Sequence, residues 1–503
     1  MIRKLLIANR GEIACRIIRA AREMGVRTVA VYSEADKDAL HVKLADEAVF
    51  IGPSEAAASY LRIEGILDVA RSTGADAIHP GYGFLSERAE FADACEQAGV
   101  IFVGPPASAM RKLGSKIEAK QIAVSAGVPV TPGYFEANAG AEELSRAAKE
   151  IGYPVMLKAS AGGGGRGMRV VRDPEMFDDE FRIASDEALK SFGDGAMMVE
   201  KLIDRPRHLE VQVLADRHGN LACLFERECS LQRRHQKIVE EAPSALLAIG
   251  GDVRLWDRMQ KAARSLVLAA GYVGAGTVEF ITDFEGKDFY FMEVNARLQV
   301  EHPVTEEVTG LDLVQWQLKI AAGEPLSISF ELLEGRRSEI KGHAIEARIV
   351  AEDPARGFLP SVGKILAWAE PHAPGVRVDT GYGPGAEVSR YYDSLIAKVI
   401  AHGETRAQAI DKLRAALLDL HVLGVSTNIA YLLDILNSEG FRSGAIDTGF
   451  LGREFGEWAA SDELPYELGA ILRAASPAAA GSSGTSTQRV SAWATPDGFR
   501  NVR

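Results

Sequence analysis

Cysteine is scarce in this chain, with only 4 in 503 residues. Cys15, Cys95, Cys223 and Cys229 form no CxxC pair and share no regular spacing, which argues against a disulfide framework and a zinc site. We therefore expect a reduced, cytoplasmic protein. Long apolar runs are also missing, since no stretch reaches the ~18 residues of a membrane span. The N-terminus lacks the apolar core and the cleavage site of a signal peptide, so neither a membrane location nor secretion is expected.

Basic residues are in deficit. The chain carries 57 Lys and Arg against 70 Asp and Glu, a formal net charge of −13. A protein that binds the backbone of nucleic acids needs a clustered basic surface, so no nucleic-acid partner is expected. Basic pockets for small anions remain compatible with this charge. The length suggests about three domains, each large enough to bury a core of its own.

The pattern of apolar residues changes along the chain. Short apolar runs first alternate with helical periodicity, which predicts an α/β domain with a doubly wound parallel sheet. Adjacent strands with short turns then predict antiparallel hairpins, and a mixed α+β pattern follows. An Ala/Ser/Gly-rich linker at 474–487 precedes Trp493 and Phe499, which suggests the start of a further domain. The expected divisions are residues 1–114, 115–329 with a lid at about 132–203, 330–450, and a tail at 451–503 that begins as a helix.

A glycine run, residues 162–165, continues into Arg166 and Gly167 between two predicted strands. Glycine lets backbone N–H groups approach a phosphate closely, and Lys158 and Arg166 bring positive charge to the same place. The run matches neither GxxxxGK[ST] nor GxGxxG, which disfavours the P-loop and Rossmann folds. A flap that covers phosphates is favoured over a floppy hairpin tip.

Acidic and amide side chains mark two neighbouring predicted strands. Glu279 lies on one strand, and Glu293 and Asn295, two residues apart, share a face of the other. Oxygen ligands of this kind suit Mg²⁺ that bridges nucleotide phosphates, although a solvated sheet face would also explain them. If the chain stays extended, Arg297 and Glu301 continue on that face. An Arg beside a Glu can hold an oxyanion and offer a general base, or it can be a simple surface ion pair.

A basic run sits inside this acidic chain at residues 233–237, which include Arg233, Arg234, His235 and Lys237. Capture of an anion fits this composition, and a solvated basic face is the alternative. His208 is ambiguous on local grounds, since a lone histidine is more often structural than functional.

In unbroken order over about residues 2–450, these segments resemble the biotin carboxylases, a family with an ATP-grasp core. The glycine run alone is weak evidence, but its occurrence in order with the segments around Lys237, Asn295–Glu301 and Arg348 is highly specific. The opening residues 6–14 and the segment 79–87 resemble the N-terminal domain of the same family. The resemblance therefore implies the biotin carboxylase component, or alpha subunit, of a biotin-dependent acyl-CoA carboxylase.

The resemblance also implies a role for each matching residue. Glu301 would deprotonate bicarbonate, and Arg348 would bind biotin and stabilise its enolate. The catalytic set would comprise Arg297, Glu301, Lys237 and Arg348. The bicarbonate ligands would be Lys237, Arg297, Gln299 and Val300. The metal ligands would be Glu279, Glu293 and Asn295. The ATP-binding residues would be Lys116, Lys158, Gly164, Gly165, Glu200, Lys201, Leu202, Ile203, His208, His235, Glu279 and Glu293.

The implied reaction is the ATP-dependent carboxylation of biotin through carboxyphosphate, with Mg²⁺ or Mn²⁺. Biotin would arrive on a separate carrier domain, because the chain has no Ala/Val-Met-Lys-Met biotinylation motif. The implied partners are this carrier and a carboxyltransferase subunit, within a larger complex that contains a homo-oligomer. The alternatives are an ATP-grasp ligase that uses an amine, a fragment of a pyruvate carboxylase, and a catalytically silent subunit. The final acyl acceptor stays open between acetyl-, propionyl- and methylcrotonyl-CoA.

Overall fold

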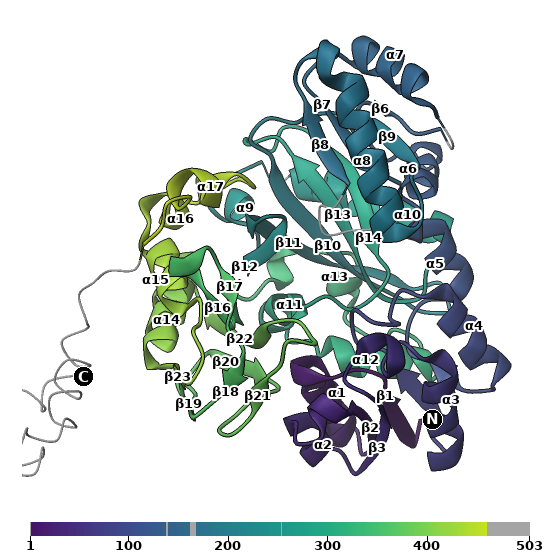
Figure 1. Ribbon diagram of the computed structural model, residues 1–503, viewed down its shortest axis with the longest axis vertical. Coiled ribbons are helices and arrows are strands. Elements are labelled where there is room, and N and C mark those ends of the chain that lie inside the picture. The colour runs from purple at the N-terminus through teal and green to yellow at the C-terminus, as the bar shows by residue number, and fades with distance from the viewer. Residues whose placement is uncertain (1, 137–138, 161–166, 253, 460–503) are drawn as a thin grey trace, which may run out of the picture. The chain divides into compact units, whose positions relative to one another are not determined.

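The computed structural model describes residues 2–136, 139–160, 167–252 and 254–459 (Figure 1). The whole glycine run, with Gly164 and Gly165, lies outside the described residues, as does Arg166. So do the predicted linker at 474–487 and the aromatic residues Trp493 and Phe499. Within the described ranges, no helix is long and apolar enough to cross a membrane.

A parallel sheet with the strand order β3-β2-β1-β4-β5 forms the N-terminal part, as the sequence predicts. Helix α1 buries Ile13, Ile17 and Ala20 on one face, which is the spacing of an amphipathic helix. The elements are β1 (Lys4–Ile7), α1 (Gly11–Glu23), β2 (Arg27–Ser33), α2 (Leu40–Leu44), β3 (Glu47–Gly52), α3 (Ile63–Thr73), β4 (Ala77–His79), α4 (Ala89–Gln97), β5 (Ile101–Phe102) and α5 (Ala107–Gly114).

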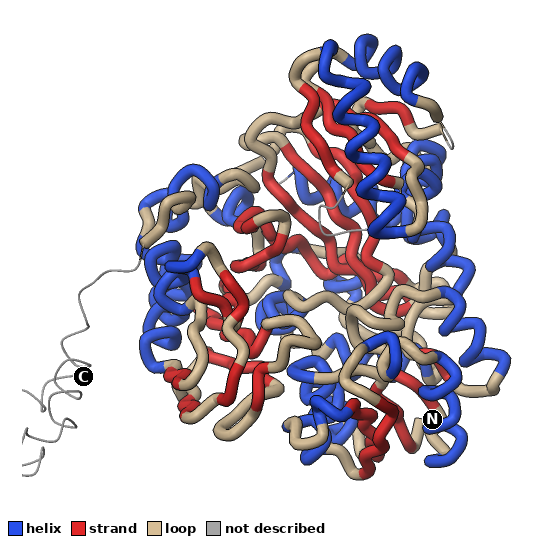
Figure 2. The backbone as a smooth tube through the Cα atoms, viewed as in Figure 1, coloured by secondary structure: helices blue, strands red, loops and turns tan. Residues whose placement is uncertain are grey.

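A small antiparallel sheet with the order β6-β9-β7-β8 follows helix α6 (Lys116–Ser125). Two helices pack on this sheet around a core of its own, which includes Leu144, Leu157 and Val199 (Figure 2). The elements are β6 (Gly133–Tyr134), α7 (Ala141–Ile151), β7 (Val155–Ala159), β8 (Met168–Val171), α8 (Phe177–Phe192) and β9 (Met197–Lys201).

An eight-stranded sheet with the order β14-β13-β10-β11-β12-β15-β22-β20 is the largest feature of the fold. In Figure 1 its teal strands continue into green ones, because β12 pairs antiparallel with β15. One sheet therefore joins strands on both sides of residue 330. Its strands are β10 (Arg207–Ala215), β11 (Leu221–Arg233), β12 (Gln236–Ala242), β13 (Gly274–Thr282), β14 (Phe289–Asn295), β15 (His343–Val350), β20 (Val376–Thr380) and β22 (Leu395–Gly403).

The remaining helices and short strands pack around this sheet. The helices are α9 (Ala245–Ala248), α10 (Arg254–Ala270), α11 (His302–Thr309), α12 (Leu313–Ala321), α13 (Phe330–Leu333), α14 (Arg406–Asp419), α15 (Ile429–Asn437), α16 (Glu439–Arg442) and α17 (Phe450–Glu454). The short strands are β16 (Glu352–Asp353), β17 (Leu359–Pro360), β18 (Gly363–Lys364), β19 (Ala367–Ala369), β21 (Glu387–Val388) and β23 (His421–Leu423).

Apolar and polar residues alternate along strand β10, so that one set faces the core and the other faces the site. Leu209, Val211 and Val213 pack in the core that also holds Trp256 of α10. The residues between them carry polar side chains, and because successive strand residues point to opposite faces, His208 and Glu210 lie on the other face. Along residues 208–213 of β10, the apolar side chains thus face this core and the polar ones face the site.

Candidate active site

A cleft of about 1300 Å³ is lined by side chains from every part of the described fold. Glu12 and Tyr82 come from the N-terminal part, and Lys158 comes from the small sheet. Lys237 and Arg348 come from the large sheet. Segments far apart in the sequence therefore meet around one volume that is large enough for a nucleotide and a second substrate.

A row of charged side chains crosses four strands beside this cleft. Arg227 of β11 lies opposite Glu210 of β10, Glu210 lies opposite Glu279 of β13, and Glu279 lies opposite Glu293 of β14. Directly opposed residues in antiparallel strands hold their Cβ atoms roughly 4.5–5.5 Å apart. Strand register therefore places three carboxylates and a guanidinium side by side.

Lys237 forms the electrostatic centre of the cleft. Its Nζ donates hydrogen bonds to Glu210 Oε2 at 2.7 Å, to Glu279 Oε1 at 2.8 Å and to Glu301 Oε1 at 2.7 Å. Burial alone would lower the pKa of Lys237, but nearby Cys229 and these three carboxylates raise the pKa well above its usual value. The lysine is therefore a permanent cation, and it faces the cleft.

Glu279 gathers four polar partners. Its Oε1 accepts from Lys237 and also from the amides of Asn295 at 2.8 Å and Gln299 at 2.9 Å. Its Oε2 lies 3.3 Å from His208 Nε2. Burial disfavours the charge, but Lys237 and His208 outweigh it and hold the pKa of Glu279 well below the usual range.

Oxygen donors in this cleft fit a hard divalent cation. Glu279 and Glu293 lie opposite each other in register, and both line the cleft. Asn295 adds an amide from the end of β14. Anionic oxygen ligands of this kind hold Mg²⁺ or Mn²⁺ together with the phosphates of a substrate.

Glu301 lies at the N-terminus of helix α11 and not on an extended segment. The expectation that Asn295 to Glu301 stay extended is wrong, because strand β14 ends at Asn295 and the chain then turns into the helix. The turn brings Glu301 to Lys237 and to Arg348, whose Nη2 lies 2.9 Å from Glu301 Oε2. Burial opposes the charge of Glu301, but Lys237 and Arg348 lower its pKa far enough to keep it ionised.

Arg348 and Arg297 both line the cleft. Arg348 Nη2 lies 2.5 Å from Glu240 Oε1, and this ion pair together with Glu301 outweighs burial and raises the pKa of the guanidinium. Arg297 Nε donates to Glu87 Oε2 at 3.0 Å, and its Nη2 donates to Asn295 Oδ1 at 2.9 Å. Both guanidinium groups are therefore oriented before any substrate is bound.

The lysines expected to bind ATP are held by carboxylates. Lys116 Nζ lies 2.5 Å from Glu293 Oε2, and Lys158 Nζ lies 2.6 Å from Glu200 Oε2. Both lysines line the cleft. The buried Glu200 also contacts Lys120 Nζ at 2.5 Å, so one carboxylate links helix α6 to strands β7 and β9. The two lysines outweigh burial and lower the pKa of Glu200 to about 2.

Some expected site residues do not line the cleft. Glu200, Lys201, Leu202 and Ile203 are absent from its walls, and Lys201 Nζ instead donates to Gly152 O at 2.9 Å. The residues of the basic run at 233–237 have different surroundings. His235 reaches the cleft from the exposed turn between β11 and β12, whereas Arg233 also pairs with Glu352.

Two buried cations escaped the sequence analysis. Arg227 is fully buried and donates to Glu210 at 2.6 Å, to Gln299 at 2.7 Å and to Thr305 at 3.0 Å, so it ties the sheet to the loop before helix α11. Lys120 lines the cleft, and its Nζ lies 2.5 Å from Glu200 Oε1. The acid-base-acid triplet at residues 226–228 was the available signal for Arg227, because charges inside a buried strand need partners.

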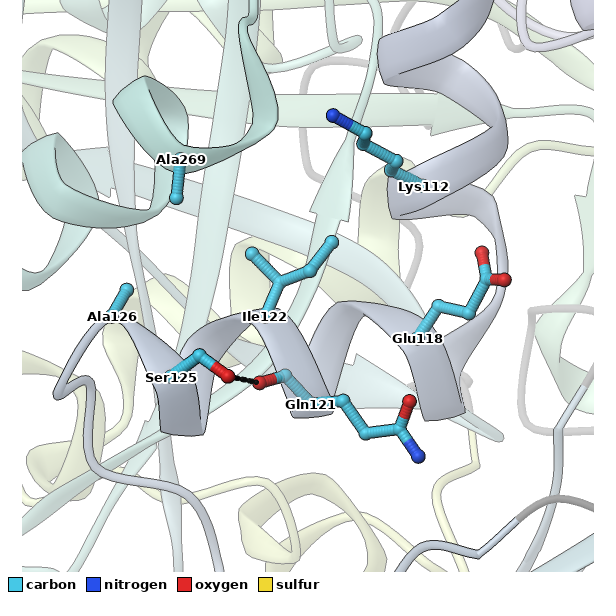
Figure 3. A pocket seen from close by; sticks show the side chains of 7 residues that line it. All are labelled: Lys112, Glu118, Gln121, Ile122, Ser125, Ala126 and Ala269. Atoms are coloured by element: carbon cyan, nitrogen blue, oxygen red, sulfur yellow. Dashed lines mark hydrogen bonds between the residues drawn. The ribbon is translucent and has the colours of Figure 1, made fainter.

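A smaller hollow of about 520 Å³ lies between helices α6 and α10 (Figure 3). It is lined by aliphatic, amide and hydroxyl groups, with Lys112 and Glu118 at its rim. Figure 3 shows Ser125 bonded to the backbone of Gln121, as a helical serine commonly is. No cluster of convergent charges distinguishes this hollow.

Comparison with known proteins accounts for this arrangement. Three family models match in order: the biotin carboxylase N-terminal domain at residues 1–110, the ATP binding domain of the carbamoyl-phosphate synthase L chain at 115–329, and the biotin carboxylase C-terminal domain at 346–453. Biotin carboxylase 1 of Bacillus subtilis is 51% identical over 451 residues, which cover 90% of this chain and 98% of that protein. The chain belongs to the biotin carboxylase family.

Longer relatives in this family contain the same region. The alpha subunit of the mitochondrial methylcrotonoyl-CoA carboxylase of Rattus norvegicus is also 51% identical over 451 residues. The match covers 90% of this chain but only 62% of that subunit, so the chain spans about three fifths of its length.

The solved structures of the family agree with the fold. One is the biotin carboxylase domain of the 2-oxoglutarate carboxylase of Hydrogenobacter thermophilus, in complex with MgADP, ADP and bicarbonate. It superposes with a TM-score of 0.85 at 46% identity and covers 90% of this chain and 98% of that one. The mixed α/β architecture with an ATP-grasp core is thereby confirmed.

Proposed function

We propose that this chain carboxylates biotin on a carrier domain at the expense of ATP and bicarbonate, as the first half-reaction of an acyl-CoA carboxylase. One observation carries the proposal. Lys237 joins Glu279, an expected ligand of the metal, to Glu301, the expected base, and Arg348 contacts the same base. Groups for phosphate, bicarbonate and biotin are thus within one cleft.

Glu301 acts as the base that removes the proton of bicarbonate. Lys237 and Arg297 hold the resulting dianion, with Gln299 and the backbone of Val300 beside them. Lys237 and Arg348 lower the pKa of Glu301 and keep it ionised at neutral pH. Cations that hold bicarbonate lower the pKa of its proton in the same way, so the transfer to Glu301 stays feasible. The preorganised charges stabilise the dianion without rearrangement during the reaction.

The main contribution of the site to phosphoryl transfer is to position the two reactants. An oxygen of the resulting carbonate dianion attacks the γ-phosphorus while the bond to ADP breaks, which forms carboxyphosphate. Lys116, Lys158, His208 and His235 neutralise the phosphates. The resemblance assigns Gly164 and Gly165, which lie outside the described residues, to the same phosphates. The resemblance also assigns Glu200, Lys201, Leu202 and Ile203 to the nucleotide. None of these four residues lines the cleft, and Glu200 acts on the phosphates by holding Lys158. Glu279, Glu293 and Asn295 would hold a divalent ion, which would add positive charge beside these phosphates.

Biotin binds on the Arg348 side of the base. Carboxyphosphate breaks into CO₂ and phosphate, and the phosphate takes the proton from the ureido nitrogen of biotin. The electron pair left on the ureido group forms the new N–C bond with CO₂. Arg348 stabilises the biotin enolate, because its guanidinium group stays protonated and positively charged at working pH.

The chain works with further components under this proposal. Residues 132–203 act as the lid of an ATP-grasp domain at 115–329, supported by a small sheet with a core of its own. Residues 1–114 and 330–450 flank this domain. A carrier domain, a carboxyltransferase subunit and further copies of the chain complete the complex. Four buried free thiols support a reducing compartment such as the cytoplasm.

Release of ADP by the purified chain tests the proposal. With Mg²⁺ and ATP, we expect release that depends on bicarbonate and that free biotin increases. Ammonia replaces biotin in a parallel reaction, because a ligase that uses an amine is the nearest alternative. Stimulation by ammonia with no effect of biotin would overturn the proposal in favour of that ligase.

A further inference from the structure

Glu240 and Glu346 are two buried carboxyl groups to which the proposed reaction assigns no role. Glu240 lies on β12 and Glu346 on β15, and the two residues are directly opposed in the antiparallel pairing of these strands. Both are 0% exposed. Opposed residues point to the same face with Cβ atoms roughly 4.5–5.5 Å apart, so the carboxyl groups share one dry space.

Three of the four oxygen atoms in this pair have no hydrogen-bond partner within the described part of the chain. Glu240 Oε1 accepts from Arg348, with Nε at 2.5 Å. Glu240 Oε2 and both oxygens of Glu346 are buried without a partner. A buried carboxylate without a donor is costly, because nothing compensates for the water that the ion has lost. A proton shared between the groups would remove this cost.

The cations around the pair already serve other anions. Lys398 of β22 faces Glu346, yet its Nζ lies 3.3 Å from Glu12 Oε2 and donates to Val300 O at 2.9 Å. Arg348 is shared between Glu240 and Glu301. The charged groups that face the pair from the surrounding elements are Lys237 of β12, Arg348 of β15, Lys398 of β22 and Glu301 at the start of α11, with Glu12 of α1 and Asp379 and Arg377 of β20 behind Lys398.

We propose that Glu346 is a neutral carboxylic acid that donates its proton to Oε2 of Glu240, so that the pair carries a single negative charge and positions Arg348. Two opposed carboxyl groups in a dry site cannot both ionise cheaply, and a shared proton is the usual outcome. In agreement, burial raises the pKa of Glu346 well above its usual value, and Lys398 only partly offsets this. Burial likewise raises the pKa of Glu240 to about 7.

The consequence for Arg348 rests on the proposed function. Arg348 has to contact an anionic substrate while it remains aligned by Glu240. A pair with one negative charge orients the guanidinium. A pair with two would hold Arg348 more tightly and would repel the incoming anion. Glu346 is in this sense a positioning residue for the biotin side of the site.

Infrared spectroscopy of the whole chain tests the proton directly. A protonated carboxyl group has a carbonyl stretch that is separate from the carboxylate bands and that shifts in D₂O. We expect such a band at pH 6, where exposed carboxyl groups are ionised, and we expect Glu346→Gln to abolish it. Glu240→Gln, which replaces the acceptor of the proton by an amide, should shift or remove the same band.

Glu241→Gln is the matched control, because Glu241 is the buried neighbour on β12. Arg406 and His343 outweigh burial and lower the pKa of Glu241 to about 2, so this substitution should leave the band in place. No band in the wild-type chain would overturn the proposal. A band that survives both Glu346→Gln and Glu240→Gln would also overturn it. The wild-type spectrum decides the first point even if a variant does not fold.

Kinetics test the positioning role separately from the proton. At pH values above that at which the Glu240–Glu346 pair loses its shared proton, the wild-type KM for free biotin should rise about tenfold per pH unit, as the loss of a single proton requires. In Glu346→Gln this rise should be absent, because the pair cannot gain a second charge. An equal rise in both proteins would refute the positioning role. A chain without turnover would refute the proposed function, while the infrared result would still decide whether Glu346 is protonated.

Discussion

Replacement of Lys237 by methionine removes the cation at the centre of the cleft while it keeps most of the side-chain volume. Glu210, Glu279 and Glu301 each lose a hydrogen bond of 2.7–2.8 Å. Each carboxylate retains another donor, namely Arg227, Asn295 and Arg348 respectively. We expect the pKa of Glu301 to rise toward its usual value, because Lys237 is the largest cause that lowers it.

The expected losses of folding stability and of kcat in Lys237→Met follow from the burial of these groups. Breaking a buried ion pair by removal of one partner costs about 3–5 kcal/mol of folding stability. Removal of one preorganised charge from a site that stabilises an oxyanion lowers kcat roughly 100- to 1000-fold. Lys237→Met should therefore unfold at lower urea concentration and lose bicarbonate-dependent release of ADP. Urea titration and a coupled ADP assay measure the two effects.

The control for this substitution is Lys261→Met, because Lys261 is an exposed lysine on helix α10. Its loss should change neither stability nor release of ADP measurably, since exposed charges contribute about 0–1 kcal/mol. Full stimulation by bicarbonate in a folded Lys237→Met protein would refute the assignment of this lysine to the bicarbonate site.

Three further predictions concern the other carboxylates. Glu301→Gln should lower bicarbonate-dependent turnover by roughly 100- to 10,000-fold, since a general base is lost. Calorimetry should show that this variant binds ATP within a few-fold of wild type. Loss of ATP binding together with turnover would contradict the assignment of Glu301 as the base. Glu279→Gln should raise the Mg²⁺ or Mn²⁺ concentration needed for half-maximal ADP release, and an unchanged metal titration would remove it from the metal site. Glu200 has a pKa of about 2 in the folded chain against an ordinary value of 4.5, so the stability it contributes is present above pH 4.5 and is lost as the pH falls toward 2. Urea titrations across that range should show a smaller acid-side loss in Glu200→Gln, and equal slopes would contradict the linkage.

Local periodicity was enough to predict most individual elements. The apolar spacing in α1 and the short runs of β1, β2 and β4 predict a parallel sheet, which the structure confirms. Hairpins such as β13 with β14 were also visible, because their turns are short. The continuity of the large sheet was not predictable, since β12 and β15 are about a hundred residues apart and no local pattern indicates that they pair.

The candidate site was only partly accessible from sequence. Residue types alone indicated Lys237, Glu279 and Glu301, and the structure brings these three together. The assumption of an extended segment at Glu301 failed, because the alternation of polar and apolar residues there reflects a turn into α11. Arg227 was missed because its five hydrogen bonds depend on tertiary packing, which local sequence does not reveal. The individual roles stay predictions until variants are assayed.

Transfer of label from bicarbonate to biotin tests the central claim most directly. The purified chain is incubated with ATP, Mg²⁺, radiolabelled bicarbonate and free biotin, and acid-labile label on biotin is counted. We predict ATP-dependent labelling that Glu301→Gln abolishes. ADP release at the full wild-type rate without any label on biotin would contradict the claim that biotin is the acceptor.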